Sequence, residues 1–472
     1  MIMIYDSLTR AKRRLEPIKP PEVSIYVCGV TPYAESHLGH ARPAVIWDVI
    51  KRHLMRRGYL VRHVQNFTDI DDKLVNRARE LGAPVSQLAT EHIDQYVHMM
   101  NRLGVLPPDY APRVTENLSS IIVFIEGLIA RGHAYATERG NVYFLVDQFP
   151  HYGRLSGRMA LPQREGVRVD LADDKKNPAD FALWKAAASE DESFDSPWGK
   201  GRPGWHIECS ALSNRYLGQQ FDLHGGGIDL IFPHHENELA QSESYLGSAP
   251  VGCWVHNGMI TKGEVKMSKS LGNGTSLEEL LTRYPAMAIR TYLLSVHYQS
   301  PLEFSEEALG QWTRGMDRVW NLWDRVAEVP SPSIKLGAAW EERLIGFEER
   351  FLSCLDDDFN TARALAEVFD MVRDVHRGVA EHAVTTALGW ARINLQKADQ
   401  ILGLMPMVTR QPEALDPLVD SLLAWRQTVR REKNFGLADE IRGIFEKSGW
   451  VVEDRSDGTS AAIRESGVEH EQ

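Results

Sequence analysis

The chain has 472 residues, of which 43% are hydrophobic and 25% are charged, and its formal net charge is −12. This composition is typical of a soluble globular protein, and no apolar run is long enough to span a membrane. A chain of this length is too long for one ordinary core, so two to four domains are expected. The acidic excess gives no support to a nucleic-acid partner, although net charge does not exclude a local basic surface.

The four cysteines are too few for a disulfide framework in a chain of this length. The segment Met1–Asp6 lacks the basic region and the long apolar stretch of a secretory signal. Both observations predict a cytoplasmic location. Cys253 and Cys354 lie in apolar surroundings and are expected to be buried packing residues. Cys28 and Cys209 remain as candidates for metal binding.

The chain opens with a strand–helix–strand–helix pattern. Glu22–Val27 is rich in β-branched residues and predicts a strand, and Ala44–Leu54 has apolar residues at helical spacing. Tyr59–Asn66 predicts the second strand, and a helix is expected from Lys73. This order is typical of a doubly wound parallel sheet, in which ligands bind beyond the carboxyl ends of the strands. The residues expected at that edge are Cys28, His37, His40 and Thr68.

The turn after the first strand contains His37-Leu-Gly39-His40 at the start of the expected helix. Two histidines three residues apart share one face of a helix. A helix N-terminus favours a phosphate, because it presents free N–H groups and the positive end of the dipole, and Gly39 lets a flat ligand approach the backbone. Taken alone, two histidines that cap their own helix are the simpler interpretation.

The pattern then changes. Residues 113–222 are interpreted as an insertion that contains a strand at Asn141–Val146. Phe221–His224 and Val251–His256 predict the later strands of the parallel sheet. A helix is expected to begin near Pro233, because proline is favoured at the first helical position.

The second half of the chain is predominantly helical. Helices are expected at Ser276–Tyr284 and Ala286–His297, and residues 306–405 have an almost purely helical pattern. The segment Asp356–Thr361 is expected at the start of a bundle helix, with its acidic residues capping and charging the helix N-terminus. The segment 406–417 holds three prolines and is expected to be a linker to a short C-terminal segment.

A motif in mid-chain changes the interpretation of the histidine turn. Lys266-Met-Ser-Lys269-Ser places two lysines in one loop, where they can meet phosphate charge. A charged loop alone is usually only solvated. Together, however, the histidine turn and this lysine loop resemble the two signatures of class I aminoacyl-tRNA synthetases. Within that class, the surrounding residues are similar to those of cysteinyl-tRNA synthetases.

The similar stretches are long and specific, and the resemblance extends with gaps from the N-terminus to about Thr459. They are residues 28–31, 66–73, 204–210 and 225–238. The resemblance implies an α/β fold, in which a Rossmann-like, doubly wound parallel catalytic domain with an insertion precedes an α-helical bundle and a small C-terminal domain. The boundaries expected are 1–112 and 223–275 for the split catalytic domain, 113–222 for the connective insertion, 276–305 for a stem-contact region, 306–405 for the helical bundle and 413–472 for an anticodon-binding region.

The resemblance also implies one zinc ion per chain. The family's four zinc positions correspond here to Cys28, Cys209, His234 and Glu238. Spacing alone does not reveal this site, because no CxxC motif is present, and a helix-capping His234 with a core Cys209 is the simpler interpretation on composition alone. Zinc favours a thiolate, so it would separate cysteine from serine where a hydrophobic pocket discriminates weakly.

The activity implied is the ATP-dependent activation of L-cysteine to cysteinyl adenylate and its transfer to the 3′ end of tRNA-Cys, with Mg²⁺ accompanying ATP. By resemblance, His37, His40, Lys266 and Lys269 are catalytic, and Gly39 joins them in binding ATP. The residues expected to hold the amino acid are Gly29, Thr68, Trp205 and Asp229, the last facing the α-ammonium group. The protein is expected to act as a monomer and away from membranes.

Local basic clusters are the only feature of composition that points toward RNA. They lie at residues 10–14, 51–57 and 426–433, and each is explained equally well by a solvated helix face. Through the family resemblance, the third cluster is expected to meet tRNA phosphates. Its members are Arg426, Arg430, Arg431 and Lys433.

Three positions depart from the family pattern, and two alternative functions stay open. The departures are Ala34 in place of an aspartate, Gly274 in place of an aromatic residue, and Ser460-Ala461 where a tryptophan is common. A mycothiol-type ligase would transfer activated cysteine to an amino sugar, but such relatives lack a counterpart of residues 413–459. A non-catalytic, zinc-containing tRNA-binding paralogue is disfavoured because both signature motifs are intact.

Overall fold

The computed structural model describes two compact units, Met1–Pro406 and Met407–Gln472. The residues described are 1–158, 174–187, 192–263, 265–266, 275–326, 329, 339–381, 383–406, 422, 425–426, 428–430, 434–447, 450–454 and 460–464.

A four-stranded parallel sheet organises the first unit, with the strand order β10–β9–β3–β4. The strands are β3 (Glu22–Val30), β4 (Leu60–Phe67), β9 (Phe221–Gly227) and β10 (Val251–Asn257). Residues 23–27 of β3 are all buried, as expected for a parallel strand that is covered on both faces. The chain runs from β3 outward to β4, and later from β9 outward to β10 on the other side. The strand order therefore switches between β3 and β9, where the carboxyl ends of the strands border a ligand-binding crevice.

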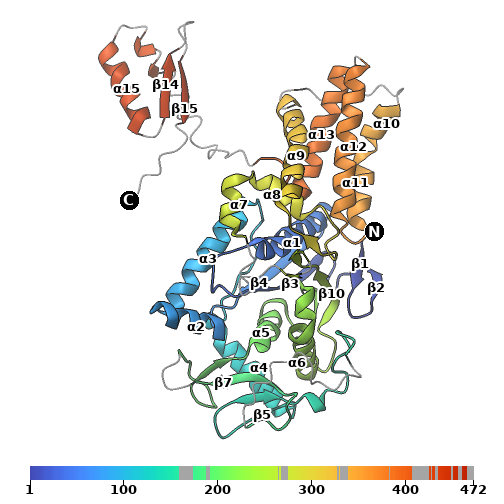
Figure 1. The fold of residues 1–472 in the computed structure, drawn as a ribbon, viewed down its shortest axis with the longest axis vertical. Coiled ribbons are helices and arrows are strands. Elements are labelled where there is room, and N and C mark those ends of the chain that lie inside the picture. The colour runs from blue at the N-terminus through green and yellow to red at the C-terminus, as the bar shows by residue number, and fades with distance from the viewer. Residues whose placement is uncertain are drawn as a thin grey trace. The chain divides into compact units, whose positions relative to one another are not determined.

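Helices cover both faces of this sheet (Figure 1). They are α1 (Leu38–Arg56) on one face and α5 (Trp205–Leu217) and α6 (Glu236–Leu246) on the other. Successive residues of β3 point to opposite faces, so Ile25 packs with Ile46 of α1, whereas Tyr26 packs with Ile207 of α5. The doubly wound α/β fold predicted from the sequence is confirmed.

The chain between β4 and β9 forms helices and a separate antiparallel sheet. The helices are α2 (Asp72–Leu81), α3 (Val85–Arg102) and α4 (Leu118–Ala130). The sheet has the order β5 (Ala134–Ala136), β6 (Val142–Phe144), β7 (Phe181–Ala186) and β8 (Gly201–Pro203). The strand predicted at Asn141–Val146 is present as the shorter β6, since a 3₁₀ turn begins at Val146.

Two small strand pairings flank the parallel sheet. A hairpin of β1 (Met3–Asp6) and β2 (Ala11–Arg14) lies at the N-terminus. Downstream of β10, β11 (Ile260–Lys262) pairs antiparallel with β12 (Val265–Lys266) and parallel with β13 (Leu302–Glu303). Both predicted packing cysteines, Cys253 and Cys354, are buried.

Helices α7 (Leu277–Arg283) and α8 (Ala286–Leu293) follow β12. α8 ends four residues before the predicted end at His297. Its last turn tightens, because the N–H groups of Leu294 and Ser295 bond to carbonyls three residues back. The chain then enters β13.

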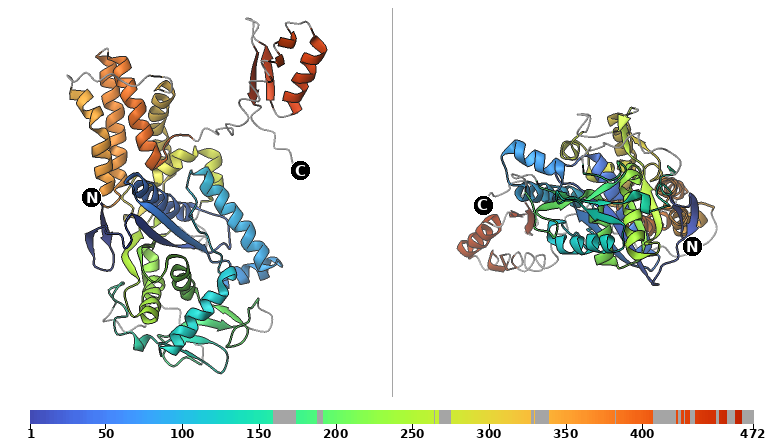
Figure 2. Two further views of the ribbon diagram at one scale, coloured as in Figure 1. Left: turned by 180° about the vertical axis from the view of Figure 1, so that it is seen from behind. Right: turned by 90° about the horizontal axis from the view of Figure 1, so that it is seen from below.

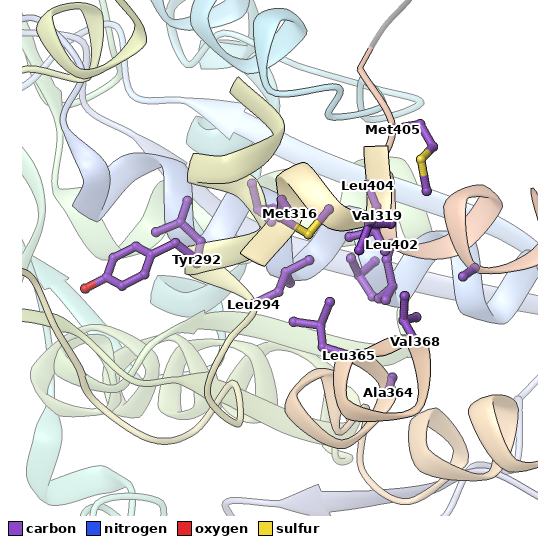
Figure 3. Close-up of a cluster of buried hydrophobic side chains, with 14 of the residues drawn as sticks. Tyr292, Leu294, Met316, Val319, Ala364, Leu365, Val368, Leu402, Leu404 and Met405 are labelled. Atoms are coloured by element: carbon purple, nitrogen blue, oxygen red, sulfur yellow. The ribbon is translucent and has the colours of Figure 1, made fainter. Parts of the chain in front are cut away.

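A helical bundle completes the first unit (Figures 1 and 2). Its helices are α9 (Glu306–Val326), α10 (Ala339–Ile345), α11 (Phe347–Asp356), α12 (Thr361–Ala380) and α13 (Val384–Leu402). Helix α9 buries Leu309, Met316 and Val319 on one stripe at helical spacing. Figure 3 shows how this stripe meets Leu365 of α12 and Leu402 at the end of α13. The bundle core is continuous with the apolar face of α1.

The acidic triplet Asp356–Asp358 does not cap a helix, so the sequence interpretation of this motif is wrong. The N-cap of α12 is Asn360, whose side chain accepts the N–H of Arg363. Asp356 instead ends α11 and accepts hydrogen bonds from His53 and Arg57 at the C-terminal end of α1. Asp356 therefore joins the bundle to the helix that covers one face of the parallel sheet.

The second unit contains α15 (Phe435–Lys447) and an antiparallel hairpin of β14 (Trp450–Asp454) and β15 (Ser460–Arg464). Val429, Ala438, Ile441 and Phe445 form its described apolar core. The segment predicted as a linker lies outside the described residues from residue 407 onward.

Candidate metal and nucleotide site

The four side chains expected to bind zinc converge at the carboxyl edge of the parallel sheet. Cys28 is near the end of β3, Cys209 is on α5, and His234 and Glu238 lie just before and within α6. The Sγ atoms of Cys28 and Cys209 are 3.7 Å apart, and Cys209 Sγ is 3.6 Å from His234 Nε2. Glu238 Oε1 lies 2.9 Å from His234 Nε2 and 3.3 Å from Cys28 Sγ. All four ligand atoms lie within 4.8 Å of one another.

This donor set fits a tetrahedral zinc ion. With zinc–sulfur bonds of about 2.3 Å and zinc–nitrogen or zinc–oxygen bonds of about 2.0 to 2.2 Å, neighbouring ligand atoms are roughly 3.3 to 3.8 Å apart. The sulfur–sulfur, sulfur–nitrogen and sulfur–oxygen separations of 3.7, 3.6 and 3.3 Å fall in this range. The nitrogen–oxygen separation of 2.9 Å is somewhat shorter. Two sulfur atoms, one nitrogen and one oxygen are donors that zinc accepts.

A kink in the chain precedes His234. Phe232 has extended dihedral angles (φ −138°, ψ 130°), and the regular helix α6 begins at Glu236 rather than near Pro233 as predicted. After the kink, the four-residue spacing brings His234 and Glu238 into contact.

Two further histidines that sequence reasoning missed approach the same donors. His224 and His235, with Cys28 and Glu238, form a second group whose ligand atoms lie within 4.8 Å of one another. His224 Nε2 is 2.9 Å from Glu238 Oε2, and His235 Nε2 is 3.2 Å from Cys28 Sγ. The signal was present in the sequence, because His224 lies in a predicted strand of the same sheet as Cys28, and His235 adjoins His234.

The ionisation of the cluster follows from burial and from its internal contacts. Burial opposes the charge of Glu238, but His224 and His234 outweigh it and hold the pKa of this carboxyl well below its usual range. Burial likewise opposes the charge of His234, yet Glu238 raises its pKa to about 10. A hydrogen bond from Cys28 lowers the pKa of Cys209 to about 6, whereas burial raises the pKa of Cys28. The contacts within the cluster thus favour the charged form of Cys209 over that of Cys28.

A buried polar chain borders the cluster and contains two of the residues expected to hold the amino acid. The Gly29 N–H donates to Asn66 Oδ1 at 3.0 Å, and a Cβ on Gly29 would lie 1.4 Å from the Asn66 carbonyl oxygen. Asn66 donates to the Thr68 hydroxyl, which in turn donates to Glu208 at 2.9 Å. Asn66 and Glu208 were not predicted as site residues. Only glycine fits at position 29.

The other two expected amino-acid contacts differ in how close they lie to the cluster. The ring of Trp205, which is 40% exposed, stacks on His234 with their centroids 4.1 Å apart. Asp229 lies in the short helical turn Ile228–Leu230 at the carboxyl end of β9, and its side chain is exposed. Trp205 therefore contacts one of the metal donors directly, whereas Asp229 is placed only at the carboxyl end of β9.

In the histidine turn, one histidine caps its own helix and both histidines share one face of it. His37 is the N-cap of α1, and its Nδ1 accepts the Gly39 N–H at 3.0 Å. His40 Nδ1 accepts the His37 N–H at 3.3 Å, and the two rings stack with their centroids 4.0 Å apart. Both imidazoles therefore stand together at the positive end of the α1 dipole.

The lysine loop is described only at its two ends. Lys266 is the last residue of β12, while Lys269 and Gly274 lie outside the described residues. Beyond the loop, Ser276 forms a β-bridge with His37, and the Leu277 N–H donates to the Ser36 carbonyl at 3.1 Å. The chain therefore returns from the lysine loop directly to the histidine turn.

The basic cluster at residues 51–57 is engaged in ion pairs and does not form a free RNA-binding face. The four basic side chains of residues 51–57 all pair with acidic residues of the first unit. Their partners are Asp109 for Lys51, Asp48 for Arg52, Glu348 for Arg56 and Asp356 for Arg57. In the C-terminal cluster Arg426 is buried, which contradicts its expected contact with phosphate, and Arg431 and Lys433 lie outside the described residues.

The sheet, its switch point and the histidine turn define a class I tRNA synthetase catalytic unit. Residues 14–314 match the family described as tRNA synthetases class I (C) catalytic domain, and residues 350–406 match the DALR domain. Among the described helices, none is both long and apolar enough to cross a membrane.

Proteins named cysteine–tRNA ligase match nearly the whole chain. The one from Alkalilimnicola ehrlichii is 42% identical and covers 98% of this chain and 99% of that protein, and the one from Aeropyrum pernix is 45% identical over 97% and 99%. The chain belongs to the cysteine–tRNA ligase family of class I tRNA synthetases. The solved structure of Mycobacterium tuberculosis methionyl-tRNA synthetase bound by methionyl-adenylate shares the fold, with a TM-score of 0.61, 16% identity and coverage of 81% of this chain and 90% of that one.

Proposed function

We propose that the chain activates L-cysteine with ATP to cysteinyl adenylate and transfers the cysteinyl group to the 3′ end of tRNA-Cys, releasing pyrophosphate and AMP. The buried donor set of Cys28, Cys209, His234 and Glu238 carries this proposal. It lies at the same sheet edge as the histidine turn, so a thiol-selective site adjoins a phosphate site. The family membership of the chain supports the same activity.

In this proposal the four donors hold one zinc ion per chain. When bound, zinc supplies an affinity for thiolate sulfur that it lacks for a hydroxyl, and this separates cysteine from serine. A pocket of apolar walls alone discriminates weakly between such near-isosteres. Gly29, Thr68 and Trp205 border the space beside the donors, and Asp229 is assigned to the α-ammonium group of the substrate.

The phosphate chemistry is assigned to the two signature motifs. His37 and His40 stabilise charge that develops on the phosphates at the N-terminus of α1, and Lys266 and Lys269 act from the lysine loop. The substrate carboxylate attacks the α-phosphate of ATP, which is accompanied by Mg²⁺, and pyrophosphate leaves. Catalysis of this kind rests on positioning and charge stabilisation, so no side chain forms a covalent intermediate.

The acceptor is proposed to be tRNA rather than an amino sugar. The DALR-domain match at residues 350–406 and the near-complete coverage by cysteine–tRNA ligases favour tRNA. The domain roles, the monomeric state and the cytoplasmic location expected from the sequence stay predictions within this proposal.

Two assays on the purified full chain test the proposed function. The first is cysteine-dependent ATP–pyrophosphate exchange, with serine in place of cysteine as the control. The second is charging of tRNA-Cys, run beside an amino-sugar acceptor. Exchange with cysteine alone, followed by transfer to tRNA, is the expected result. Exchange without tRNA charging, but with transfer to the amino sugar, would replace this function by the alternative ligase.

A further inference from the structure

We propose that Arg42 is a positioning residue that fixes the β11–β12 hairpin, and with it Lys266, relative to the histidine turn. This inference rests on the proposed function, because it concerns the step in which ATP reacts. Arg42 lies in the second turn of α1, two residues after His40, and it is 1% exposed. Neither signature motif includes it.

The guanidinium group of Arg42 joins α1 to two other chain segments. It donates to the carbonyl oxygens of Gly258 at 2.9 Å and Met259 at 2.8 Å, immediately before β11. It also donates to the carbonyl oxygen of Ser300 at 2.5 Å, shortly before β13. A planar group with several fixed donors can span these acceptors, whereas a lysine ammonium acts as a single point.

The same two segments form the base of the sheet that carries Lys266. β11 pairs with β12 so that Thr261 lies opposite Lys266, and β11 also pairs with β13. A shift of this base relative to α1 would move Lys266 relative to both histidines. A misplacement of about 1 Å at a reacting centre can cost on the order of 10²-fold in rate.

The chemistry of the contact indicates a geometric role rather than a general gain in stability. The acceptors of Arg42 are backbone carbonyls, and burial lowers the pKa of its guanidinium to about 10, so it stays protonated at neutral pH. A buried cation pays a desolvation cost that a well-packed apolar side chain avoids. What the guanidinium group of Arg42 adds is a fixed position of α1 relative to the segments that precede β11 and β13.

The test compares Arg42 with a second arginine of the same helix. Arg42→Met removes the guanidinium group while keeping a long side chain. Arg42→Lys keeps the positive charge, but its ammonium group cannot reach all three carbonyl acceptors. The matched control is Arg52→Met, because Arg52 donates to Asp48 and to the Gly104 carbonyl and lies about three turns further along the helix, in the C-terminal half of α1. Each holoenzyme is assayed for exchange kinetics, zinc content, cysteine affinity and thermal unfolding.

The expected result is a loss of turnover without a loss of zinc or cysteine binding. Arg42→Met should lower the kcat of cysteine-dependent exchange on the order of 10²-fold, with zinc content and cysteine affinity unchanged. Arg42→Lys should lie between it and wild type, and Arg52→Met should keep the wild-type kcat even if its melting temperature falls. Wild-type kcat in folded Arg42→Lys, or equal losses of kcat in Arg42→Lys and Arg52→Met, would overturn the proposal. Absence of exchange in wild type would instead refute the proposed function.

Discussion

The two ends of helix α1 use the same kind of side chain in opposite ways. At the N-terminal end, His37 and His40 contact each other and the backbone of their own turn. At the C-terminal end, His53 contacts Asp356, which is 303 residues further along the chain. Local contacts leave the first pair at the sheet edge to which we assign ATP, while the distant contact uses the other histidine to join two layers of the fold. The comparison sets residues proposed to act in catalysis against residues that connect parts of the structure.

Removing the imidazoles of the N-terminal end should have the largest effect. Asparagine is also a good helix N-cap, so His37→Asn removes the ring while the cap is kept. The kcat for cysteine-dependent exchange should fall on the order of 10²-fold, because a group that stabilises developing charge is lost. The free energy of unfolding should change by less than about 1 kcal/mol. Near-normal exchange in His37→Asn would reduce this turn to a capping motif.

Removing the carboxylate of the C-terminal contact should have the reverse effect. Asp356→Ala leaves the buried His53 and the partly buried Arg57 without their acceptor. The free energy of unfolding should fall by about 1.5 to 3 kcal/mol, the range for hydrogen bonds to charged groups. The kcat for exchange should stay within about twofold, since 19 helical residues put some 28 Å between the two ends of α1.

Urea unfolding measures this loss, and an exposed ion pair provides the control. Arg77 and Glu80 pair on the surface of α2, where such contacts contribute between about 0 and 1 kcal/mol. Glu80→Ala should therefore change the free energy of unfolding much less than Asp356→Ala. Equal effects of the two variants would show that the contact at the end of α1 contributes no more than a surface pair.

The smallest expected effect is a pH dependence at the C-terminal end. Burial lowers the pKa of His53 below its usual value, against the opposing influence of Asp356. In the unfolded chain histidine titrates near about 6.5. Between these two values the unfolded state binds more protons, so the free energy of unfolding falls as the pH drops from about 7 toward 5.

The variant His53→Gln removes this contribution from the holoenzyme. Urea unfolding at several pH values between neutrality and pH 5 should give a shallower slope for the variant than for wild type. The contribution of His53 is the difference between the slopes of wild type and variant, because burial also lowers the pKa of His63 and His256, which titrate in both proteins. Identical slopes would mean that His53 titrates alike in the folded and unfolded states.

The contrast between the ends of α1 also explains what the sequence could predict. β3, α1 and the stacked histidines depend on residues close in the chain, and their patterns are visible locally. The role of Asp356 depends on His53 and Arg57, so its local acidity suggested a cap that does not exist. Likewise, α8 was predicted too long because its last turn tightens before the chain enters β13.

The candidate site shows the same limit. Spacing cannot join Cys28 to Cys209, since they are brought together only by the packing of α5 against β3. The resemblance to a known family supplied that pair, together with His234 and Glu238. His224 was missed, although it lies in the strand next to β3, because nothing local distinguishes a buried histidine near a metal from one in a core.

The most direct test of the account is a spectroscopic titration of the metal centre. The full chain is loaded with cobalt(II) in place of the proposed zinc ion, and its absorption is followed while L-cysteine or L-serine is added, with Cys209→Ser as the control variant. The account predicts one metal ion per chain, a thiolate-to-metal band that grows to saturation with cysteine and does not respond to serine, and weakened metal binding in the variant. A spectrum that responds equally to both amino acids, or to neither, would contradict the claim that this cluster selects cysteine.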